Sequence, residues 1–460
     1  MSSPVTGGPG IESLGTMLTA GALLSDPAST EAYRHDWTRL PDAGTPLAVV
    51  RAGSAADVQA TIRWAAEHRV PVVPRGAGTS LAGGATAVDG CLVLSTERMT
   101  GIEIDPTTRT AVVEPGAFNA AVKDAAAPHG LWYPPDPGSF RISSIGGNVA
   151  TDAGGICCVK YGVTSDYVLG LDVVLADGRL VTLGGRTVKD VAGLPLLKLF
   201  VGSEGTLGVI TRVVLRLLPS PSPAATLVAY FDDLRDAAWA VVAMGARVRP
   251  AMLELMDAAS IGAVEDFQPM GLDREAGALL VAQSDAPGAA RTDEITVMAG
   301  CCEEAGARSV FATDDPAEGD MFLEARRAAG PAIDARGSVL AEDICVPVDR
   351  LPTAMERIGA IAREHQVEIP VFAHAGDGNL HPAIVHVPGD QEGRRRAEAA
   401  FAAILQVALD CGGTITGEHG VGRTKRSALP AQLGPDVMEL GQRVRNALDP
   451  LGILNPGVLW

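Results

Sequence analysis

Two histidines that could bind a metal ion stand in one short segment, His374-Ala375-Gly376-Asp377-Gly378-Asn379-Leu380-His381. Gly, Asp and Asn form helices poorly and turns readily, and apolar runs at 369–373 and 383–387 flank them. Asp-Gly is the favoured pair of a two-residue type I′ hairpin loop. A loop at Asp377-Gly378 would pair His374 directly with His381, with Cβ atoms about 5 Å apart on one face. Two imidazoles so placed can share a divalent ion.

A metal ion held by two histidines needs at least a third ligand. Glu418 is the candidate, because it stands beside His419 in the glycine-framed segment 411–422. A histidine pair alone, or a Glu-His pair alone, is more often structural, so the prediction depends on both occurring together. His386 falls on the opposite strand face from His381 by period-two alternation and is not counted as a ligand.

The composition indicates a soluble globular protein rather than a membrane or nucleic-acid-binding protein. The 460 residues are 47% apolar and 20% charged, which favours two or three domains, two being the simpler count. No apolar run approaches the ~20 residues of a membrane helix. The first 30 residues show no secretory or transit signal, so we expect a cytoplasmic protein. The net charge of −18 disfavours nucleic acid and anionic membranes. The seven cysteines, without a C-x-x-C pair, predict reduced packing residues.

The first glycine-rich loop follows a predicted helix and strand. Apolar residues recur at helical spacing in 55–69, with Ser54 as N-cap, and 70–74 reads as a strand. The segment 75–84 then allows backbone amides to approach a phosphate closely. A nicotinamide-binding turn is rejected, because position 81 is Leu and a strand, 91–94, follows where a helix is expected.

Two more glycine-dense segments lie at 134–155 and 201–210, and the second of them leads into a predicted strand at 210–218. Because glycine costs backbone entropy, such clusters are expected where the main chain lies against a flat ligand or turns sharply. Three loops of this kind within about 220 residues indicate an extended cofactor with a diphosphate.

These loops carry a family resemblance. The motifs Pro74-Arg75-Gly76-x-Gly78-Thr79-Ser80, Ser144-Ile145-Gly146-Gly147-Asn148, Lys189-Asp190-Val191-Ala192-Gly193 and Gly202-Ser203-Glu204-Gly205-Thr206-Leu207-Gly208 resemble the FAD-binding domain of the vanillyl-alcohol-oxidase or PCMH type over most of 46–220. The resemblance implies FAD, held non-covalently because the first loop has no histidine. Leu194-Pro195 departs from the aromatic residue that many relatives have there.

The resemblance also implies a set of cofactor-binding residues. They are Pro74, Arg75, Gly76, Ala77, Gly78, Thr79, Ser80, Gly83, Pro137, Gly138, Ser139, Ser144, Gly146, Gly147, Asn148, Thr151, Gly154, Gly155, Glu204, Gly205, Gly208, Val209, Ile210 and Asn455.

A stiff Pro-Ser junction at 219–223 is the best domain boundary. Beyond it, strands at 227–231, 279–282 and 309–312 alternate with helices at 236–248 and 291–305, and a long helix spans 392–409. We therefore expect an α+β protein: an N-terminal segment 1–45 packing on the flavin domain, a two-part PCMH-type FAD-binding domain 46–220, an α+β substrate and metal domain 221–440 with an antiparallel sheet, and a C-terminal return 441–460.

The histidine segment and the Gly417-Glu418-His419-Gly420 segment, with 341–347 and Asn455-Pro456-Gly457, resemble the FAD-linked D-2-hydroxyacid dehydrogenases. The D-lactate dehydrogenase and glycolate oxidase flavin-subunit branch is the nearest match. The resemblance implies His374, His381 and Glu418 as ligands of zinc, or of manganese or iron. It implies His419 as catalytic base and Arg326 as the partner of the substrate carboxylate, with Arg327 as the rival.

Substrate and partners are expectations from the same resemblance. Relatives that take 2-hydroxyglutarate have a lysine and an asparagine where this chain has Ala341 and Ala383, so D-lactate is favoured. Glycolate, D-2-hydroxyglutarate and a role as the flavin-carrying subunit of a glycolate oxidase stay as alternatives. We expect a quinone, a cytochrome or an electron-transfer flavoprotein as electron acceptor, with peripheral membrane association through that acceptor and a homodimer both left open.

Overall fold

The computed structural model describes residues 10–460, and the chain divides into two compact units. Unit 1 comprises the described residues up to Ala153, together with Val163–Ser220 and His419–Trp460. Unit 2 comprises Gly154–Gly162 and Pro221–Glu418. The first nine residues of the predicted segment 1–45 lie outside the described part.

The unit boundaries differ from the predicted domains in two places. The chain passes into unit 2 at Pro221, but it returns to unit 1 at His419 and not at 441. In addition, Gly154–Gly162, which the sequence placed in the flavin domain, belongs to unit 2. Packing explains the second difference, because Ile156 lies in the apolar core of unit 2 and Lys160 forms an ion pair with Asp285.

Unit 1 contains a four-stranded sheet in the order β1-β2-β4-β3. The strands β2 (Ala48–Arg51), β4 (Leu92–Ser95) and β3 (Val72–Arg75) are parallel, and β1 (Leu23–Leu24) pairs antiparallel with β2. Helix α3 (Ala55–His68) begins after Ser54, whose hydroxyl accepts a hydrogen bond from the Asp57 amide at 3.2 Å. The short helices α1 (Ile11–Gly15) and α2 (Pro27–Glu31) precede this sheet.

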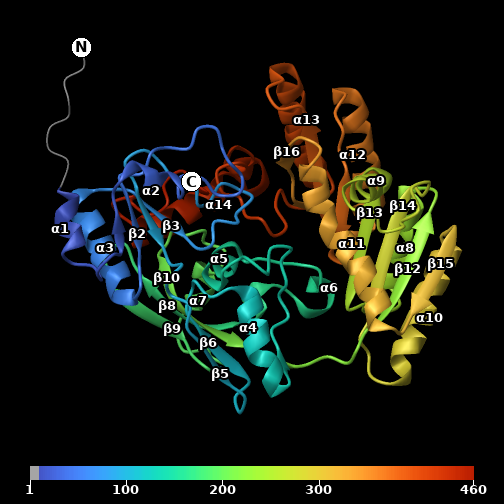
Figure 1. Cartoon of the computed structure of the whole chain (residues 1–460), viewed down its shortest axis with the longest axis horizontal. Helices are drawn as coiled ribbons and strands as arrows, with labels where there is room; N and C mark the ends of the chain where they lie inside the picture. Colours follow the sequence, from blue (N-terminus) through green and yellow to red (C-terminus); the bar gives the residue numbers. More distant parts are fainter. Residues whose placement is uncertain (1–9) are drawn as a thin grey trace. The chain divides into compact units, whose positions relative to one another are not determined.

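The second sheet of unit 1 has five antiparallel strands in the order β5-β6-β10-β8-β9 (Figure 1). They are β5 (Ile102–Asp105), β6 (Thr110–Val113), β8 (Val168–Val174), β9 (Leu180–Gly184) and β10 (Val209–Arg216). A two-stranded pair, β7 (Leu131–Trp132) and β11 (Leu218–Pro219), completes the strands. Unit 1 also holds the helices α4 (Asn119–Ala126), α5 (Ile145–Thr151), α7 (Leu197–Phe200) and α14 (Leu429–Leu448).

The second glycine-dense segment is helical where the sequence predicted a loop. Helix α5 begins after Ser144, whose hydroxyl accepts from the Gly147 amide at 3.4 Å. Glycine at 146 permits close packing, because a Cβ there would lie 2.6 Å from the Pro115 Cβ atom. Part of the glycine content of this segment therefore serves contacts within the protein.

Unit 2 is built on one antiparallel sheet in the order β15-β12-β14-β13-β18-β19-β16, with β17 also paired to β19. The strands are β12 (Ala225–Phe231), β13 (Met252–Asp257), β14 (Ala278–Ser284), β15 (Ser309–Thr313), β16 (Ser338–Ala341), β17 (Ile344–Cys345), β18 (Val371–His374) and β19 (Asn379–His386). This is the antiparallel α+β domain that the sequence predicted.

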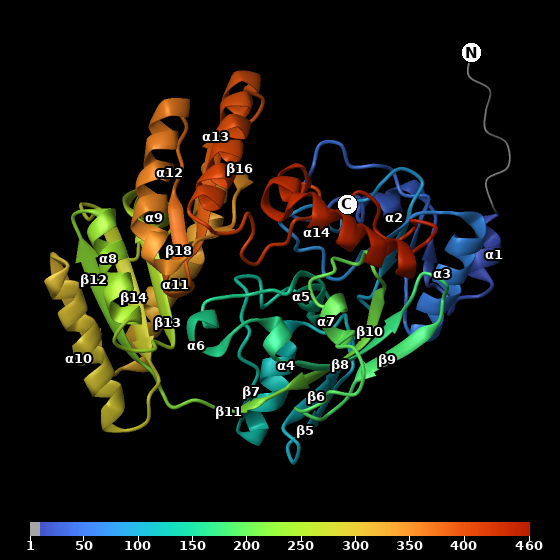
Figure 2. The ribbon, with the colours of Figure 1, turned by 180° about the vertical axis from the view of Figure 1, so that it is seen from behind.

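Helices cover both faces of this sheet. On one face, α9 (Ala258–Phe267) and α11 (Pro316–Asp334) bury apolar side chains against β13 and β14, among them Met252, Met256 and Leu323. On the other face, α8 (Leu234–Gly245), α10 (Ala289–Glu304), α12 (Leu351–His365) and α13 (Gln391–Asp410) pack in series. Figure 1 shows α11 across the first face, and Figure 2 shows α12 and α13 on the second. The short helix α6 (Cys158–Tyr161) also belongs to unit 2.

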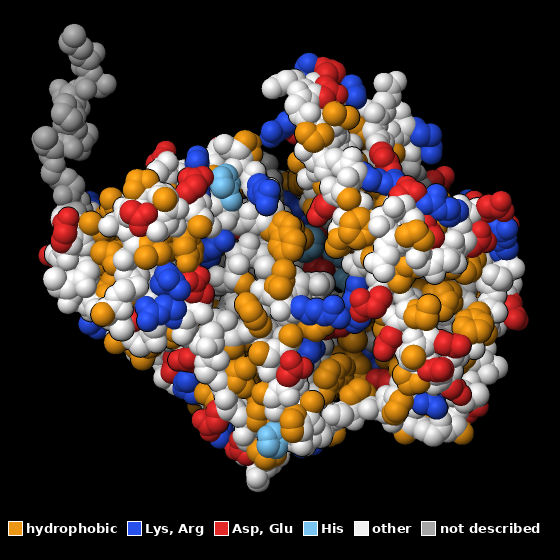
Figure 3. All heavy atoms as spheres, in the orientation of Figure 1, with side chains coloured by type: hydrophobic (Ala, Val, Ile, Leu, Met, Phe, Trp, Pro, Cys, Tyr) orange, Lys and Arg blue, Asp and Glu red, His pale blue; other side chains and the backbone are white. Residues whose placement is uncertain are grey.

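Three properties of the described residues bear on function. None of the described helices is both long and apolar enough to cross a membrane. No disulfide joins any of the seven cysteines, all of which lie among the described residues. On the face drawn in Figure 3, acidic and basic side chains are interspersed, with no region of a single sign.

Candidate active site

The hairpin that carries the two histidines has a different register from the predicted one. His374 ends β18 and pairs with Asn379, while His381 pairs with Phe372. The connection therefore spans 375–378, with a 3₁₀ turn at Ala375–Asp377 and Gly378 at φ +82°. The prediction of a two-residue type I′ loop is wrong, because Ala375 and Gly376 are part of the turn and do not pair with residues of β19.

The imidazoles nevertheless meet. His374 and His381 lie on one face of the sheet as diagonal neighbours, and long side chains can bridge such positions. Their ring centroids are 5.0 Å apart and the rings are nearly perpendicular. Glu418 Oε1 lies 3.4 Å from His374 Nε2 and 3.3 Å from His381 Nε2. The three predicted ligands thus form one cluster with nitrogen and oxygen atoms suited to a divalent ion.

A buried carboxylate, Glu254, orients the first histidine. Glu254 is 1% exposed and stands directly opposite His374 on β13. Its two oxygens lie 2.9 and 3.0 Å from His374 Nδ1. A proton on Nδ1 that is donated to Glu254 leaves the Nε2 lone pair directed at Glu418, which is the arrangement of a metal-binding histidine and its supporting carboxylate.

The same carboxylate holds Arg326. Arg326 Nε lies 2.7 Å from Glu254 Oε2, and the guanidinium carbon lies 4.6 Å from the Phe372 ring centroid. The Nε and Nη2 atoms are both buried and have no hydrogen-bond partner among the described residues, so the contact of Nε with Glu254 is an ion pair. Arg327, one position further round α11, forms an ion pair with Glu324 at 2.9 Å and is more exposed. Helix phase therefore directs Arg326, and not Arg327, at the histidine cluster.

A second buried carboxylate, Asp343, holds the Glu418 segment. Its Oδ2 atom accepts hydrogen bonds from the backbone amides of Gly417 and Glu418 at 2.9 and 3.0 Å and from the Thr416 hydroxyl at 2.7 Å. Its Oδ1 atom accepts from Asn379 Nδ2 at 2.7 Å. Asp343 thus ties the third ligand to the turn that follows His374.

Electrostatics in the cluster favours an ionised glutamate. Burial opposes ionisation of Glu418, but the two imidazoles outweigh burial and hold the pKa of its carboxyl well below the ordinary value. Burial likewise disfavours charge on His374, yet Glu254 and Glu418 raise the pKa of that imidazole. Burial raises the pKa of Asp377 to about 7, and its carboxylate accepts from the Asn379 amide at 3.4 Å, as expected for a turn residue.

The segment Gly154–Gly162, which belongs to unit 2, begins directly against Glu418 of the cluster. A Cβ atom on Gly154 would be 2.7 Å from Glu418 Oε2 and 3.2 Å from Glu418 Cβ. Gly154 therefore serves the close approach of the backbone to Glu418. The resemblance placed Gly154 and Gly155 among the flavin-binding residues, whereas here the chain passes from unit 1 to unit 2 after Ala153.

His419 follows Glu418 in the chain and opens the return segment of unit 1. The next residues are anchored firmly, because Glu204 accepts hydrogen bonds from the amides of Val421 and Gly422 at 2.9 and 2.8 Å. Burial raises the pKa of Glu204 to about 7. Asn455 donates to the Glu204 carbonyl at 2.7 Å. Glu204 and Asn455, both predicted at the cofactor, thus also tie unit 1 together.

The first glycine-rich loop has the character of an anion cradle. Residues 74–81 are all half-buried, and the backbone amides of Gly76, Gly78, Thr79 and Ser80 donate no hydrogen bond within the described chain. Consecutive unsatisfied amides in a loop form a concavity that suits phosphate oxygens. Gly76 packs against Ser144, where a Cβ would lie 2.2 Å from the hydroxyl oxygen.

Other residues predicted to bind the cofactor can be placed by their surroundings in unit 1. Gly205 and Gly208 are required by packing, since a Cβ would lie 3.0 Å from Pro74 Cγ and 2.5 Å from Val173 Cγ1, respectively. Val209 and Ile210 are buried in β10. Gly83 has φ +76°, and Gly138 has open space around it.

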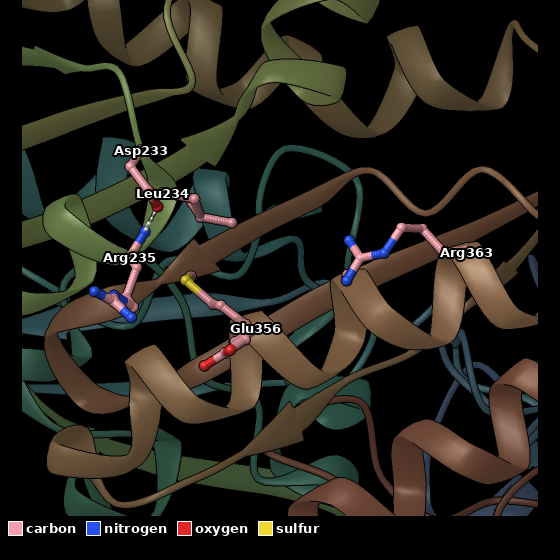
Figure 4. A pocket seen from close by; sticks show the side chains of 7 residues that line it. Asp233, Leu234, Arg235, Glu356 and Arg363 are labelled. Atoms are coloured by element: carbon pink, nitrogen blue, oxygen red, sulfur yellow. Dashed lines mark hydrogen bonds between the residues drawn. The ribbon is translucent and has the colours of Figure 1, made fainter.

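A hollow on unit 2 is separate from the predicted site. It is lined by Asp233, Leu234, Arg235, Met355, Glu356, Gly359 and Arg363, from α8 and α12 (Figure 4). The one hydrogen bond drawn there is the N-cap contact of α8, from the Arg235 amide to Asp233 at 2.8 Å. This surface lies on the helical layer opposite α11, so it has no part in the cluster.

Sequence reasoning missed Glu254. The signal that could have found it is a carboxylate in the middle of the apolar run Ala251-Met252-Leu253-Glu254-Leu255-Met256. A charged residue inside a buried strand requires a partner.

Comparisons with known proteins agree with this architecture. The model for the C-terminal domain of FAD linked oxidases matches residues 220–459, and the model for an FAD binding domain matches 46–184. The glycolate oxidase subunit GlcD of Bacillus subtilis is 39% identical, over 96% of this chain and 93% of the relative. The D-lactate dehydrogenase of Archaeoglobus fulgidus is 37% identical over 93% and 95%, and the D-2-hydroxyglutarate dehydrogenase of Stutzerimonas stutzeri is 31% identical over 98% and 98%. The structure of p-cresol methylhydroxylase with bound substrate superposes with a TM-score of 0.81 at 17% identity, covering 97% of this chain and 95% of that one, which shows a shared fold.

Proposed function

Because the chain belongs to the family of FAD-linked oxidases, we propose that it oxidises a short D-2-hydroxy acid, D-lactate first, to the 2-oxo acid with FAD and a divalent metal ion. The chain is an FAD-linked oxidoreductase of the group that contains glycolate oxidase subunits, D-lactate dehydrogenases and D-2-hydroxyglutarate dehydrogenases. The observation that carries the finer proposal is the cluster of His374, His381 and Glu418 beside the buried guanidinium of Arg326.

The three clustered side chains fit a divalent ion. Two imidazole nitrogens and one carboxylate oxygen are a usual donor set for zinc, with manganese and iron as alternatives. The Glu254 carboxylate on His374 Nδ1 supports the fit, because metal-binding histidines regularly donate their other ring nitrogen to a carboxylate.

Arg326 would receive the substrate carboxylate. Its Nε forms an ion pair with Glu254, and its buried Nη2 atom has no hydrogen-bond partner among the described residues. A planar guanidinium binds carboxylate with defined geometry and is always charged, which offsets the net charge of −18 for an anionic substrate. His419, next in the chain after Glu418, would take the proton of the 2-hydroxyl as a neutral imidazole.

A bound metal ion would supply Lewis-acid activation of the 2-hydroxyl, and bound FAD would supply the acceptor for the hydride of C2. The unsatisfied amides of Gly76, Gly78, Thr79 and Ser80 would hold the FAD diphosphate. No histidine stands in this loop, so the flavin would be non-covalent.

The sheet beside His381 supports a short substrate. Ala383 lies two residues past His381 on β19 and therefore on the same face, and Ala341 pairs directly with Ala383 from β16. These two methyl groups offer no cation for a second carboxylate, which disfavours 2-hydroxyglutarate. Glycolate is the second candidate, because the 39% identical relative is a glycolate oxidase subunit. A role as a flavin-carrying subunit, with its electron acceptor supplied by a partner, belongs to that alternative.

Anaerobic reduction of the flavin by a panel of D- and L-2-hydroxy acids tests the proposal. D-Lactate should bleach the oxidised-flavin spectrum of the isolated protein faster than glycolate or D-2-hydroxyglutarate, and L-lactate should not. Faster bleaching by glycolate than by D-lactate would identify glycolate as the preferred substrate. A protein that no 2-hydroxy acid reduces would refute the proposal.

A further inference from the structure

The buried carboxylate of Glu254 serves two functional side chains at once. Its Oε1 and Oε2 atoms lie 2.9 and 3.0 Å from His374 Nδ1, and Oε2 also lies 2.7 Å from Arg326 Nε. His374 is a proposed metal ligand, and Arg326 is the proposed partner of the substrate carboxylate. No other described carboxylate contacts both side chains.

The surroundings fix Glu254 itself. It lies in the centre of the sheet, paired with Val281 on β14 and with His374 on β18, and its side chain is 1% exposed. A glutamate in this position has little rotamer freedom, so the distance between the His374 imidazole and the Arg326 guanidinium is fixed by their shared contact with it.

We propose that Glu254 is the positioning residue that fixes the spacing between the metal-binding imidazole of His374 and the carboxylate-binding guanidinium of Arg326. This inference rests on the proposed function. A 2-hydroxy acid carries its hydroxyl and carboxylate on adjacent carbons, so a site that selects it must hold the metal ligand and the arginine at a constant separation. One carboxylate shared by both supplies that constraint.

Two substitutions separate the two contacts. In Glu254→Gln, the amide oxygen can still accept from His374 Nδ1, but the negative charge that forms the ion pair with Arg326 is lost. In Glu254→Ala, both contacts are lost. The matched control is Asp257→Asn on the same strand, because the hydrogen bonds of Asp257 run to the amides of Ser260 at 2.7 Å and Val371 at 3.0 Å and involve neither His374 nor Arg326.

Zinc binding to chelator-stripped, FAD-loaded protein is measured by competition with an indicator dye. Oxamate, a non-reacting analogue of lactate, is titrated against the flavin absorbance of the zinc-loaded protein. Glu254→Gln should weaken oxamate at least 10-fold and zinc less than 10-fold. Glu254→Ala should weaken oxamate at least as much and zinc by about 10- to 100-fold. Asp257→Asn should change neither constant by more than about 2-fold.

In turnover, Glu254→Gln should raise KM at least 10-fold with kcat within about 3-fold, because a binding contact is lost from ground and transition states alike. Unchanged zinc and oxamate constants in both Glu254 variants would overturn the inference, as would an equal loss in Asp257→Asn. A wild-type protein that binds neither zinc nor oxamate would instead refute the proposed function, so the two failures are distinct.

Discussion

The rings of His374 and His381 stand edge to face with centroids 5.0 Å apart, although the two residues are not opposite each other in the ladder. Each pairs with another residue, and the rings meet diagonally across β18 and β19. In this diagonal arrangement both Nε2 atoms approach Glu418 Oε1, at 3.4 and 3.3 Å. The metal prediction thus depends on the face that the histidines share and not on direct pairing.

Removal of one ligand should release the metal and spare the flavin. We expect His374→Ala and Glu418→Ala to purify with full FAD, with less than about a tenth of the wild-type zinc and with most turnover lost, because two donors do not close a zinc site. Elemental analysis and the flavin spectrum measure the two contents. Full metal stoichiometry in both variants would show that the ligand set is wrong.

Neighbouring arginines on α11 provide a matched pair. Arg326→Lys should raise KM for D-lactate at least 10-fold, because lysine cannot contact Glu254 and a carboxylate with planar, bidentate geometry. Arg327→Lys should leave KM within about 2-fold, since Arg327 pairs with Glu324. Steady-state kinetics distinguishes them, and equal effects would remove Arg326 from its role.

The role of His419 as the proposed base can be tested independently of metal binding. His419→Ala should keep both zinc and FAD and should slow anaerobic flavin reduction by about 100-fold or more, as expected for loss of a general base. Stopped-flow absorbance measures the rate. Wild-type reduction rates in this variant would exclude His419 as the base.

The close approach at Gly154 gives a test that needs no change to a ligand. Because a Cβ would lie 2.7 Å from Glu418 Oε2, Gly154→Ala should displace the carboxylate and weaken zinc at least 10-fold with FAD content unchanged. Gly300→Ala in α10 is the control, as nothing lies within 4 Å of its Cβ position. The same zinc affinity in both variants would contradict the contact.

The Asp257 carboxyl predicts a pH effect on stability. Burial raises its pKa from 3.8 to about 6 in the folded protein. The folded state therefore holds a proton that the unfolded chain has lost, so this residue makes stability fall as pH rises from about 4 to about 6. The effect is at most about 3 kcal/mol. Asp257→Asn should remove it, so the free energy of unfolding of the variant minus that of the wild type should rise between about pH 4 and 6, as measured by urea unfolding of both metal-loaded proteins at pH 4, 5, 6 and 7. Parallel profiles would be inconsistent with the raised pKa.

Local patterns in the sequence identified much of the fold. The helix after Ser54, the strand before the first glycine-rich loop and the long helix at α13 were predicted because caps and apolar periodicity are local properties. The register of the hairpin was not predicted. Asp377-Gly378 is a favoured turn pair, but the packing of Gly376 against Leu253 and Val159 favours a longer connection. Those two contacts come from distant segments of the chain.

The sequence by itself determined which side chains could do chemistry, namely two histidines around a turn and a glutamate beside a histidine, and it determined membership of the FAD linked oxidases. Only the tertiary structure decided that Arg326 and not its neighbour points at the cluster, that Glu254 holds both Arg326 and His374, and that Gly154 lies against Glu418. The physical reason is that strand pairing and helix packing bring together residues far apart in the chain, and no local pattern records which buried charge will meet which partner.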